Sequence, residues 1–264
     1  MQRLTINGQQ LEVRQIAGSK TLAPIVFLHE GLGSVSMWTQ RGLDWPRAVC
    51  SASGRAGIVY SRRGYGQSGP APKGHNAVWP GRNVLPPDYM HREAFDVLPA
   101  LLADLQIDRP VLLGHSDGAT IALLYASQFP VAACIAMAPH VVVESMAVSA
   151  IKQAKQAFKS GDLRQRLAKH HADVDSAFWQ WNDVWLSESF ASFDIRPDCQ
   201  RITAPLLVVQ GLNDEYGTML QLDEIARAAP HTQQTRLADC GHSPHRDQPQ
   251  VCVDSIVMFV KAVR

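Results

Sequence analysis

A serine between two glycines, in the sequence GHSDG of Gly114–Gly118, constrains the fold of this chain more than any other stretch. The apolar run Val111–Leu113 precedes it, and a helix-like run over 119–126 follows it. A strand, a sharp turn and a helix together raise a serine as a nucleophile at the carboxyl edge of a parallel sheet. Side chains in place of the two glycines would collide with neighbouring backbone in such a turn. The pattern predicts that Ser116 is a nucleophile, the alternative being an ordinary strand-to-helix turn.

Short apolar runs with the character of buried strands recur along the chain. Besides Val111–Leu113, they are Ile25–Leu28, Gly57–Tyr60, Cys134–Met137 and Leu206–Val209. Helix-like segments, including 92–105 and 119–127, separate them, and Leu4–Ile6 and Leu11–Arg14 flank an Asn-Gly turn typical of a hairpin. Buried strands that alternate with helices predict an α/β fold, with a mostly parallel sheet flanked by helices.

Two stretches interrupt this alternation. Pro70–Pro87, with five prolines and with His75, Trp79 and Arg82, predicts a long loop at the sheet edge. The stretch 144–198 carries helical patterns over 146–160, 163–171 and 174–185, and holds three of the six tryptophans. About 55 residues is too many for one crossover connection, so we expect a helical cap over the carboxyl edge of the sheet. The predicted domains are a core of residues 1–140 and 199–264 and a cap insertion of residues 141–198.

Composition limits the kinds of partner and compartment that we expect for this protein. Of the 264 residues, 46% are hydrophobic, and 25 Lys and Arg against 24 Asp and Glu give a formal charge of +1, with no basic block to suggest nucleic acid. Five scattered cysteines without a C-x-x-C pair indicate a reducing compartment. The N-terminus lacks the apolar core of a signal peptide, and the longest apolar run, 131–143, is too short to span a bilayer. We expect a cytoplasmic protein with a small-molecule substrate and no membrane partner, its oligomeric state left open.

A nucleophilic serine needs a base and an acid from elsewhere in the chain. Histidine suits the base because its pKa lies near the working pH, and a carboxylate must hold the imidazole in the right tautomer. In this kind of fold the order is serine, then acid, then histidine. Asp214 follows the strand-like stretch Leu206–Gly211 by three residues, and His242 comes 28 residues later. We predict Ser116, Asp214 and His242 as a catalytic triad, with Glu215 as the alternative acid and His245 as the alternative base.

The developing oxyanion needs backbone N–H donors. One donor should be the residue after the nucleophile, Asp117, and the other should come from the loop after the first buried strand. In that loop Gly31 is the candidate, with Leu32 as the alternative.

Five motifs in this order resemble the α/β-hydrolase superfamily. They are Leu28–Ser34 (LHEGLGS), Ser61–Ser68 (SRRGYGQS), the serine turn, Gly211–Asp214 (GLND) and Gly241–Pro244 (GHSP). The resemblance implies Ser116 as nucleophile, Asp214 as acid, His242 as base, Gly31 and Asp117 as oxyanion donors, and a lid at the position of the cap. The chain departs from the usual pattern where Glu30 stands in place of a glycine and Ser61 in place of an aspartate.

Asp117 is the residue that could restrict the range of substrates. Many relatives carry an apolar or neutral residue there. A buried carboxylate at this position would oppose the oxyanion unless it is paired. One interpretation is that Asp117 turns away to local backbone or to an arginine such as Arg62 or Arg63. The other is that it binds a cationic group of the substrate, since the serine–aspartate turn is similar to that of biphenyl-hydrolase-like amino-acid ester hydrolases.

Three other patterns are weaker. Gly64–Gly69 matches G-x-G-x-x-G, but prolines follow it where a nucleotide site would need a helix. His170 and His171 precede two aspartates, but adjacent helical residues do not share a face, so a solvated helix end is expected. The stretch Cys240–His245 has no second ligand pair at metal-site spacing. We therefore predict no cofactor and no metal.

The sequence as a whole predicts a serine hydrolase that cleaves a small carboxylic ester, lactone or thioester through an acyl-enzyme. Two alternatives remain open. The same triad could hydrolyse a carbon–carbon bond in a ring-cleavage product, or the scaffold could bind a ligand without catalysis.

Overall fold

The computed structural model describes residues 1–70 and 85–263, and these form one eight-stranded sheet in the order β1-β2-β6-β3-β7-β8-β9-β10. Strands β1 (Gln2–Ile6) and β2 (Gln9–Ile16) form the predicted antiparallel hairpin, and β2 also pairs antiparallel with β6. The hairpin turn at Asn7 and Gly8 has φ of 49° and 75°, the left-handed conformation that suits these two residues. All other neighbours in the sheet are parallel.

The five predicted buried strands are present. They are β3 (Ile25–Leu28), β6 (Gly57–Ser61), β7 (Val111–His115), β8 (Ala133–Met137) and β9 (Leu206–Gly211), and every residue in them is buried. Burial on both faces explains why these segments read as continuous apolar runs rather than as an alternation of apolar and polar residues. The predicted α/β fold with a mostly parallel sheet is confirmed.

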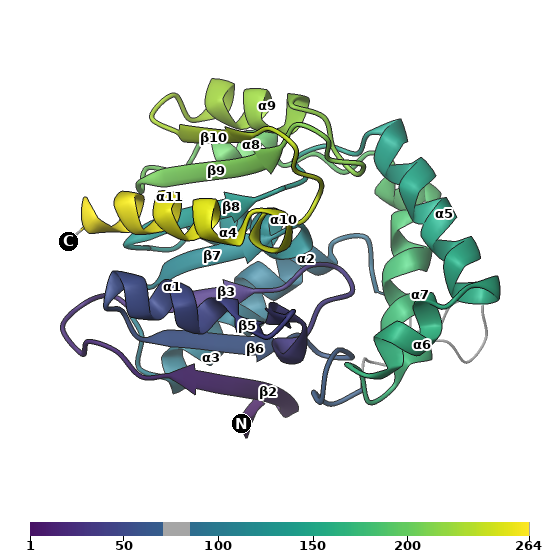
Figure 1. Ribbon diagram of the computed structural model, residues 1–264, viewed down its shortest axis with the longest axis horizontal. Coiled ribbons are helices and arrows are strands. Elements are labelled where there is room, and N and C mark those ends of the chain that lie inside the picture. The colour runs from purple at the N-terminus through teal and green to yellow at the C-terminus, as the bar shows by residue number, and fades with distance from the viewer. Residues whose placement is uncertain (71–84, 264) are drawn as a thin grey trace.

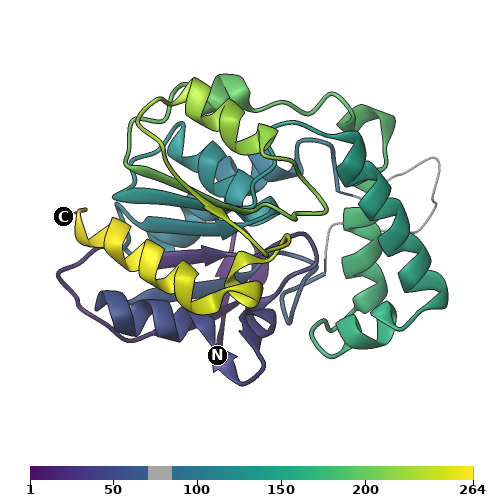
Figure 2. The same ribbon diagram turned by 45° about the horizontal axis from the view of Figure 1, so that its top comes forward.

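Alternate strand residues pack against different helices. One face, with Phe27 and Val59, packs against α1 (Trp45–Ser53) and α11 (Pro249–Lys261). The opposite face, with Val26 and Ile58, packs against α3 (Leu98–Asp104), α4 (Asp117–Ala126) and α9 (Leu220–Ala228). The period of two along each strand therefore divides the core into the two layers visible in Figures 1 and 2.

Two elements differ from expectation. The predicted helix over 92–105 is composite: α2 (Tyr89–Arg92), a π-helical turn η2 (Glu93–Val97) and then α3. Strand β10 (Gln233–Leu237) was not predicted, because its sequence QQTRL is mostly polar and it lies at the sheet edge with one neighbour. The loop predicted over Pro70–Pro87, with its His75, Trp79 and Arg82, falls largely outside the described residues.

The chain between β8 and β9 is helical. It forms α5 (Ser145–Ser160), α6 (Leu163–Ala168), α7 (Val174–Trp185), a short turn η3 (Glu188–Phe190) and α8 (Arg196–Cys199). Helices α5, α6 and α7 lie beyond the carboxyl ends of the parallel strands, whereas α8 lies beside α9 (Figure 1). In the described part of the chain, no helix has both the length and the apolar character needed to cross a bilayer.

Candidate active site

The turn between β7 and α4 holds Ser116 in a strained backbone conformation. Its φ and ψ are 55° and −121°, outside the regions that a side chain normally permits. A Cβ at Gly114 would lie 2.1 Å from the carbonyl oxygen of Gly118, and a Cβ at Gly118 would lie 2.1 Å from that of Leu28. Both glycines are therefore required by close backbone contact, as the sequence predicts, and they let the serine project from the edge of the sheet.

Ser116, His242 and Asp214 meet at this edge. The Ser116 hydroxyl lies 2.9 Å from Nε2 of His242, and Nδ1 of His242 lies 2.9 and 3.0 Å from the two carboxylate oxygens of Asp214. Nδ1 donates to the carboxylate, so a neutral ring leaves the Nε2 lone pair directed at the serine proton. The arrangement has the geometry of a nucleophile, a base and an orienting acid.

The loop after β9 stabilises the charged form of Asp214. Oδ1 accepts from the Tyr216 N–H at 2.8 Å, and Oδ2 accepts from the Gln210 side chain at 3.1 Å. Burial raises the pKa of Asp214, but the hydrogen bonds from His242 and Tyr216 outweigh burial, so its pKa lies below its usual value. The carboxylate is thus ionised at neutral pH, as an orienting acid must be.

The alternative acid and base have different contacts. Glu215 accepts from the backbone N–H of His242 at 3.2 Å and does not bond its ring. The ring of His245 packs between other aromatic rings, 5.0 Å from Trp38 and 4.7 Å from His115, and no hydrogen bond joins it to Ser116 in the described structure.

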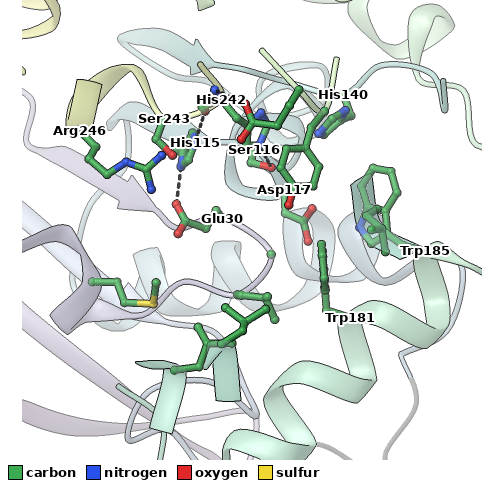
Figure 3. A pocket seen from close by; sticks show the side chains of 18 residues that line it. Glu30, His115, Ser116, Asp117, His140, Trp181, Trp185, His242, Ser243 and Arg246 are labelled. Atoms are coloured by element: carbon green, nitrogen blue, oxygen red, sulfur yellow. Dashed lines mark hydrogen bonds and ion pairs between the residues drawn. The ribbon is translucent and has the colours of Figure 1, made fainter. Parts of the chain in front are cut away.

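A cavity of about 220 Å³ opens over Ser116 (Figure 3). Helices α5 to α7 contribute only apolar or aromatic residues to its lining: Ile151, Leu163, Leu167, Trp181 and Trp185. The third tryptophan of α7, Trp179, packs instead against Phe178 at 5.2 Å and does not line the cavity. Glu30, His115 and Arg246 lie on one side of the cavity, and Asp117, Trp181 and Trp185 lie on the other.

The two predicted oxyanion donors both border this cavity. Asp117 is the first residue of α4, so its N–H has no partner within the helix and is available to an anion. Gly31 lies under the insertion: a Cβ there would be 2.1 Å from Nε1 of Trp181. The loop that carries Gly31 can therefore approach α7 only because this residue is a glycine.

The carboxylate of Asp117 is buried and only partly paired. Oδ2 accepts from the Tyr89 hydroxyl at 2.5 Å and lies 3.7 Å from Nη2 of Arg62, whereas Arg63 bonds the carbonyl of Pro70. Oδ1 has no hydrogen-bond partner among the described residues. Burial raises the pKa of Asp117, although Arg62 and Tyr89 oppose that shift. One oxygen thus has the internal arginine neighbour that the first interpretation expects, and the other remains unpaired.

Glu30 and His115 form a second carboxylate–histidine pair beside the first. Oε2 of Glu30 lies 2.5 Å from Nδ1 of His115, and Nε2 of His115 donates to the carbonyl oxygen of His242 at 2.7 Å. Burial opposes charge on both groups, yet their mutual attraction raises the pKa of His115 and holds the pKa of Glu30 far below its usual value. In the sequence alone, Glu30 stands out only as a departure from glycine. Its partner is 85 residues away, so no local pattern could identify the pair.

The second departure, Ser61, is compensated from another strand. Its hydroxyl donates to Oε2 of Glu12 at 2.7 Å and accepts from the Val35 N–H at 2.9 Å. The same Glu12 oxygen accepts from the Gln67 N–H at 2.9 Å. Glu12, on β2, therefore supplies a carboxylate to the turn, where the family resemblance leads us to expect an aspartate at position 61.

The expectation of a solvated helix end at His171 is wrong. This side chain is buried: Nδ1 accepts from the Gly66 N–H at 3.0 Å and Nε2 donates to the Leu32 carbonyl at 2.9 Å. Its neighbour His170 is half-buried and bonds Ser36 at 2.8 Å. The two rings thus attach the end of α6 to the loops after β3 and β6 instead of facing solvent.

Comparison with known families agrees with the observed fold. The profile of the alpha/beta hydrolase family matches residues 25–255, most of the chain. The sheet, the serine turn and this match define the class: the chain belongs to the alpha/beta hydrolase family and is a hydrolase.

Individual relatives are more distant. The chain is 26% identical over 279 residues to an sn-1-specific diacylglycerol lipase of Mus musculus, ABHD11, covering 95% of this chain and 85% of that protein. Its structure resembles the enol-lactonase from Burkholderia xenovorans LB400, with a TM-score of 0.72 and 22% identity over 98% of this chain and 100% of the other. It also resembles E-2-(acetamidomethylene)succinate hydrolase, with a TM-score of 0.71 and 19% identity over 98% of each chain. Identities this low in the two structures support the fold and not a common substrate.

Proposed function

We propose that this protein hydrolyses a small carboxylic ester, lactone or thioester through an acyl-enzyme formed on Ser116. The observation that carries the proposal is the continuous hydrogen-bond chain from Ser116 through His242 to an ionised Asp214, with successive distances of 2.9 and 2.9 Å. A protein that only binds a ligand has no need of a base oriented toward a strained serine. The geometry therefore favours catalysis over a non-catalytic ligand-binding role.

In the proposed mechanism Ser116 attacks the carbonyl carbon while His242 takes the hydroxyl proton at Nε2. Asp214 stabilises the resulting imidazolium. The N–H groups of Gly31 and Asp117 receive the oxyanion, because both border the cavity beside the serine. His242 then protonates the leaving group and, in the second half-reaction, activates the water that releases the acid.

We also propose residues 141–198 as a cap that sets the substrate's size. A cavity of about 220 Å³ is smaller than the roughly 300–1,000 Å³ of typical ligand sites, which supports a short acyl group. The apolar lining from α5 to α7 disfavours the carbon–carbon hydrolase alternative, since a dienoate substrate would need a cationic clamp from the cap. The one guanidinium among the described lining residues, that of Arg246, comes from the core.

Asp117 is the proposed specificity determinant. Asp117 lines the cavity, and its Oδ1 is buried without a hydrogen-bond partner among the described residues, so it would accept a hydrogen bond from an ammonium or hydroxyl group of a substrate that reaches it. The nearby Arg62 offsets part of the negative charge, so the bond would add selectivity without setting a full charge against the oxyanion.

The five unpaired cysteines are consistent with the cytoplasmic location that we propose for the enzyme.

Labelling with a fluorophosphonate probe, followed by turnover of p-nitrophenyl and amino-acid esters, tests the proposal. The parent enzyme should be labelled at Ser116 and should turn over at least one short ester, and Ser116→Ala should lose both. Ser243→Ala is the matched control, because Ser243 lines the same cavity and should leave labelling intact. A folded parent enzyme that is neither labelled nor active would favour the ligand-binding alternative.

A further inference from the structure

Glu30, His115 and His245 come together from three distant parts of the chain. Glu30 lies in the loop after β3, His115 ends β7, and His245 lies in the short helix α10 (Pro244–Asp247). Each offers one carboxylate oxygen or ring nitrogen, and these three atoms all lie within 4.8 Å of one another. The cluster forms part of the wall between the cavity over Ser116, which Glu30 and His115 line, and a neighbouring cavity, which His245 lines.

His115 is oriented as metal-binding histidines are. Nε2 donates to the carbonyl oxygen of His242, so Nδ1 is the nitrogen that faces the cluster, 2.5 Å from Glu30. Histidine ligands of metals almost always donate their second ring N–H to a carbonyl or carboxylate, which fixes the ring and its tautomer. The ring is therefore already oriented for a metal, and binding would displace the Nδ1 proton that now bonds Glu30.

His245 supplies the second, independent observation. Its side chain is only 5% exposed, and its Nδ1 is buried without a hydrogen-bond partner in the described part of the chain. The rings of Trp38 and Trp45, at 5.0 and 5.4 Å, hold the imidazole in place. A buried, unpaired ring nitrogen is costly unless something else binds there.

We propose that Glu30, His115 and His245 bind a divalent transition metal, with zinc as the ion that best fits two imidazoles and one carboxylate. Calcium and magnesium prefer oxygen ligands, whereas zinc takes histidine nitrogen and carboxylate oxygen at about 2.0–2.2 Å. Neighbouring ligand atoms on a tetrahedral zinc lie about 3.3 Å apart. The Glu30 carboxylate must therefore turn slightly away from His115, which its 25% exposed side chain permits.

The site would adjoin the triad without sharing a ligand with it. His115 links the metal to the peptide of His242, and Glu30 adjoins the proposed oxyanion donor Gly31 along the chain. Three protein ligands leave a fourth position for water or for a donor atom from the cavity. The nearby Arg246 is positively charged, as the metal ion would be, and its contact with Asp247 at 3.3 Å offsets part of that charge.

Isothermal titration of zinc chloride into metal-stripped Ser116→Ala protein tests the site independently of turnover. We expect one zinc per chain with a dissociation constant in the micromolar range or tighter, weakened at least thirtyfold by Glu30→Gln and by His245→Gln in the same background. His231→Gln is the matched control, because that exposed ring bonds only a backbone carbonyl and should leave affinity unchanged. Cobalt(II) gives a second readout: its visible absorption in the tetrahedral range should be present in the parent and absent in His245→Gln.

Two results would overturn the proposal. The first is the absence of stoichiometric zinc binding to the folded protein. The second is binding that survives His245→Gln and is instead abolished by His242→Gln, which would place the ion on the triad. Circular dichroism of each variant identifies any that fail to fold, and His245→Asn then replaces a misfolded His245→Gln.

Discussion

Two carboxylate–histidine pairs flank the cavity, and they differ in the direction of the second ring nitrogen. In the pair of Asp214 and His242, Nε2 points at the hydroxyl of Ser116, a group that can give up a proton. In the pair of Glu30 and His115, Nε2 bonds a backbone carbonyl, which can only accept. The same two chemical groups therefore suit proton transfer in one place and the fixing of a loop in the other. Surroundings, not residue type, decide the role.

The largest expected effect separates these roles. Asp214→Asn should lower kcat by about 10⁴, because the amide favours the wrong tautomer of His242. Glu215→Gln, a change of the adjacent carboxylate that bonds only the His242 backbone, should cost no more than a few-fold. Steady-state kinetics on the best p-nitrophenyl ester checks both. A larger loss for Glu215→Gln would show that the orienting acid has been misassigned.

A substitution that pushes the Gly31 loop away from α7 should have the next largest effect on activity. Gly31→Ala places a methyl group 2.1 Å from the indole of Trp181, so the loop must shift. A displacement of about 1 Å at reacting groups costs roughly 10² in rate, and we expect a loss of this size in kcat/KM. Trp181→Ala in the Gly31→Ala background should recover part of the loss. If the double variant were as slow as the product of the two single effects, contact with Trp181 would not be the cause.

A third carboxylate, that of Asp117, tests specificity rather than rate. We expect the parent to prefer amino-acid esters over matched deaminated esters by about ten- to a hundredfold in kcat/KM, through a charge-assisted hydrogen bond to Oδ1. Asp117→Asn should remove the preference and keep activity on neutral esters. Equal kcat/KM values for the two ester types in the parent would return Asp117 to a structural role with Arg62 and Tyr89.

The smallest expected effect belongs to the second pair. In metal-free enzyme, Glu30→Gln should lower kcat by about tenfold with little change in KM, because losing one charge-assisted bond loosens the link from His115 to the His242 peptide. His245→Gln, which breaks no such bond, should leave metal-free kcat nearly unchanged. A loss for Glu30→Gln as large as that for Asp214→Asn would contradict the contrast between the two pairs.

The elements that could be predicted were those whose burial or capping is visible in their own residue pattern. Strands buried on both faces are continuous apolar runs, and α7 covers the predicted 174–185 because Asp173 caps it through the Ser176 N–H. Strand β10 was missed because an exposed edge strand leaves no apolar pattern. The composite helix over 89–104 was predicted as regular because a π-helical turn has no sequence signature.

The residues of the candidate site likewise divide into those that local sequence predicts and those that only the folded structure brings together. Ser116 was predicted as a nucleophile from contiguous residues, because the glycines on each side of it are needed for close backbone contact, Gly114 with Gly118 and Gly118 with Leu28. Asp214 and His242 followed from chain order, and the structure brings them together with the serine. The pairing of Glu30 with His115, and the burial of His171 against Gly66, depend on segments 85 and 105 residues apart. Only the assembled sheet edge makes such contacts visible.

The carboxylate that Glu12 supplies to the turn at Ser61 limits how residues 12 and 61 can be exchanged. An aspartate acquired at position 61 while Glu12 remained would set two anions against each other. Loss of Glu12 first would leave the Gln67 N–H without its acceptor. Either single exchange should lower the stability of the turn, while the double exchange restores one charge in one place. The two positions are therefore coupled energetically, and the cost of exchanging both should differ from the sum of the two single costs.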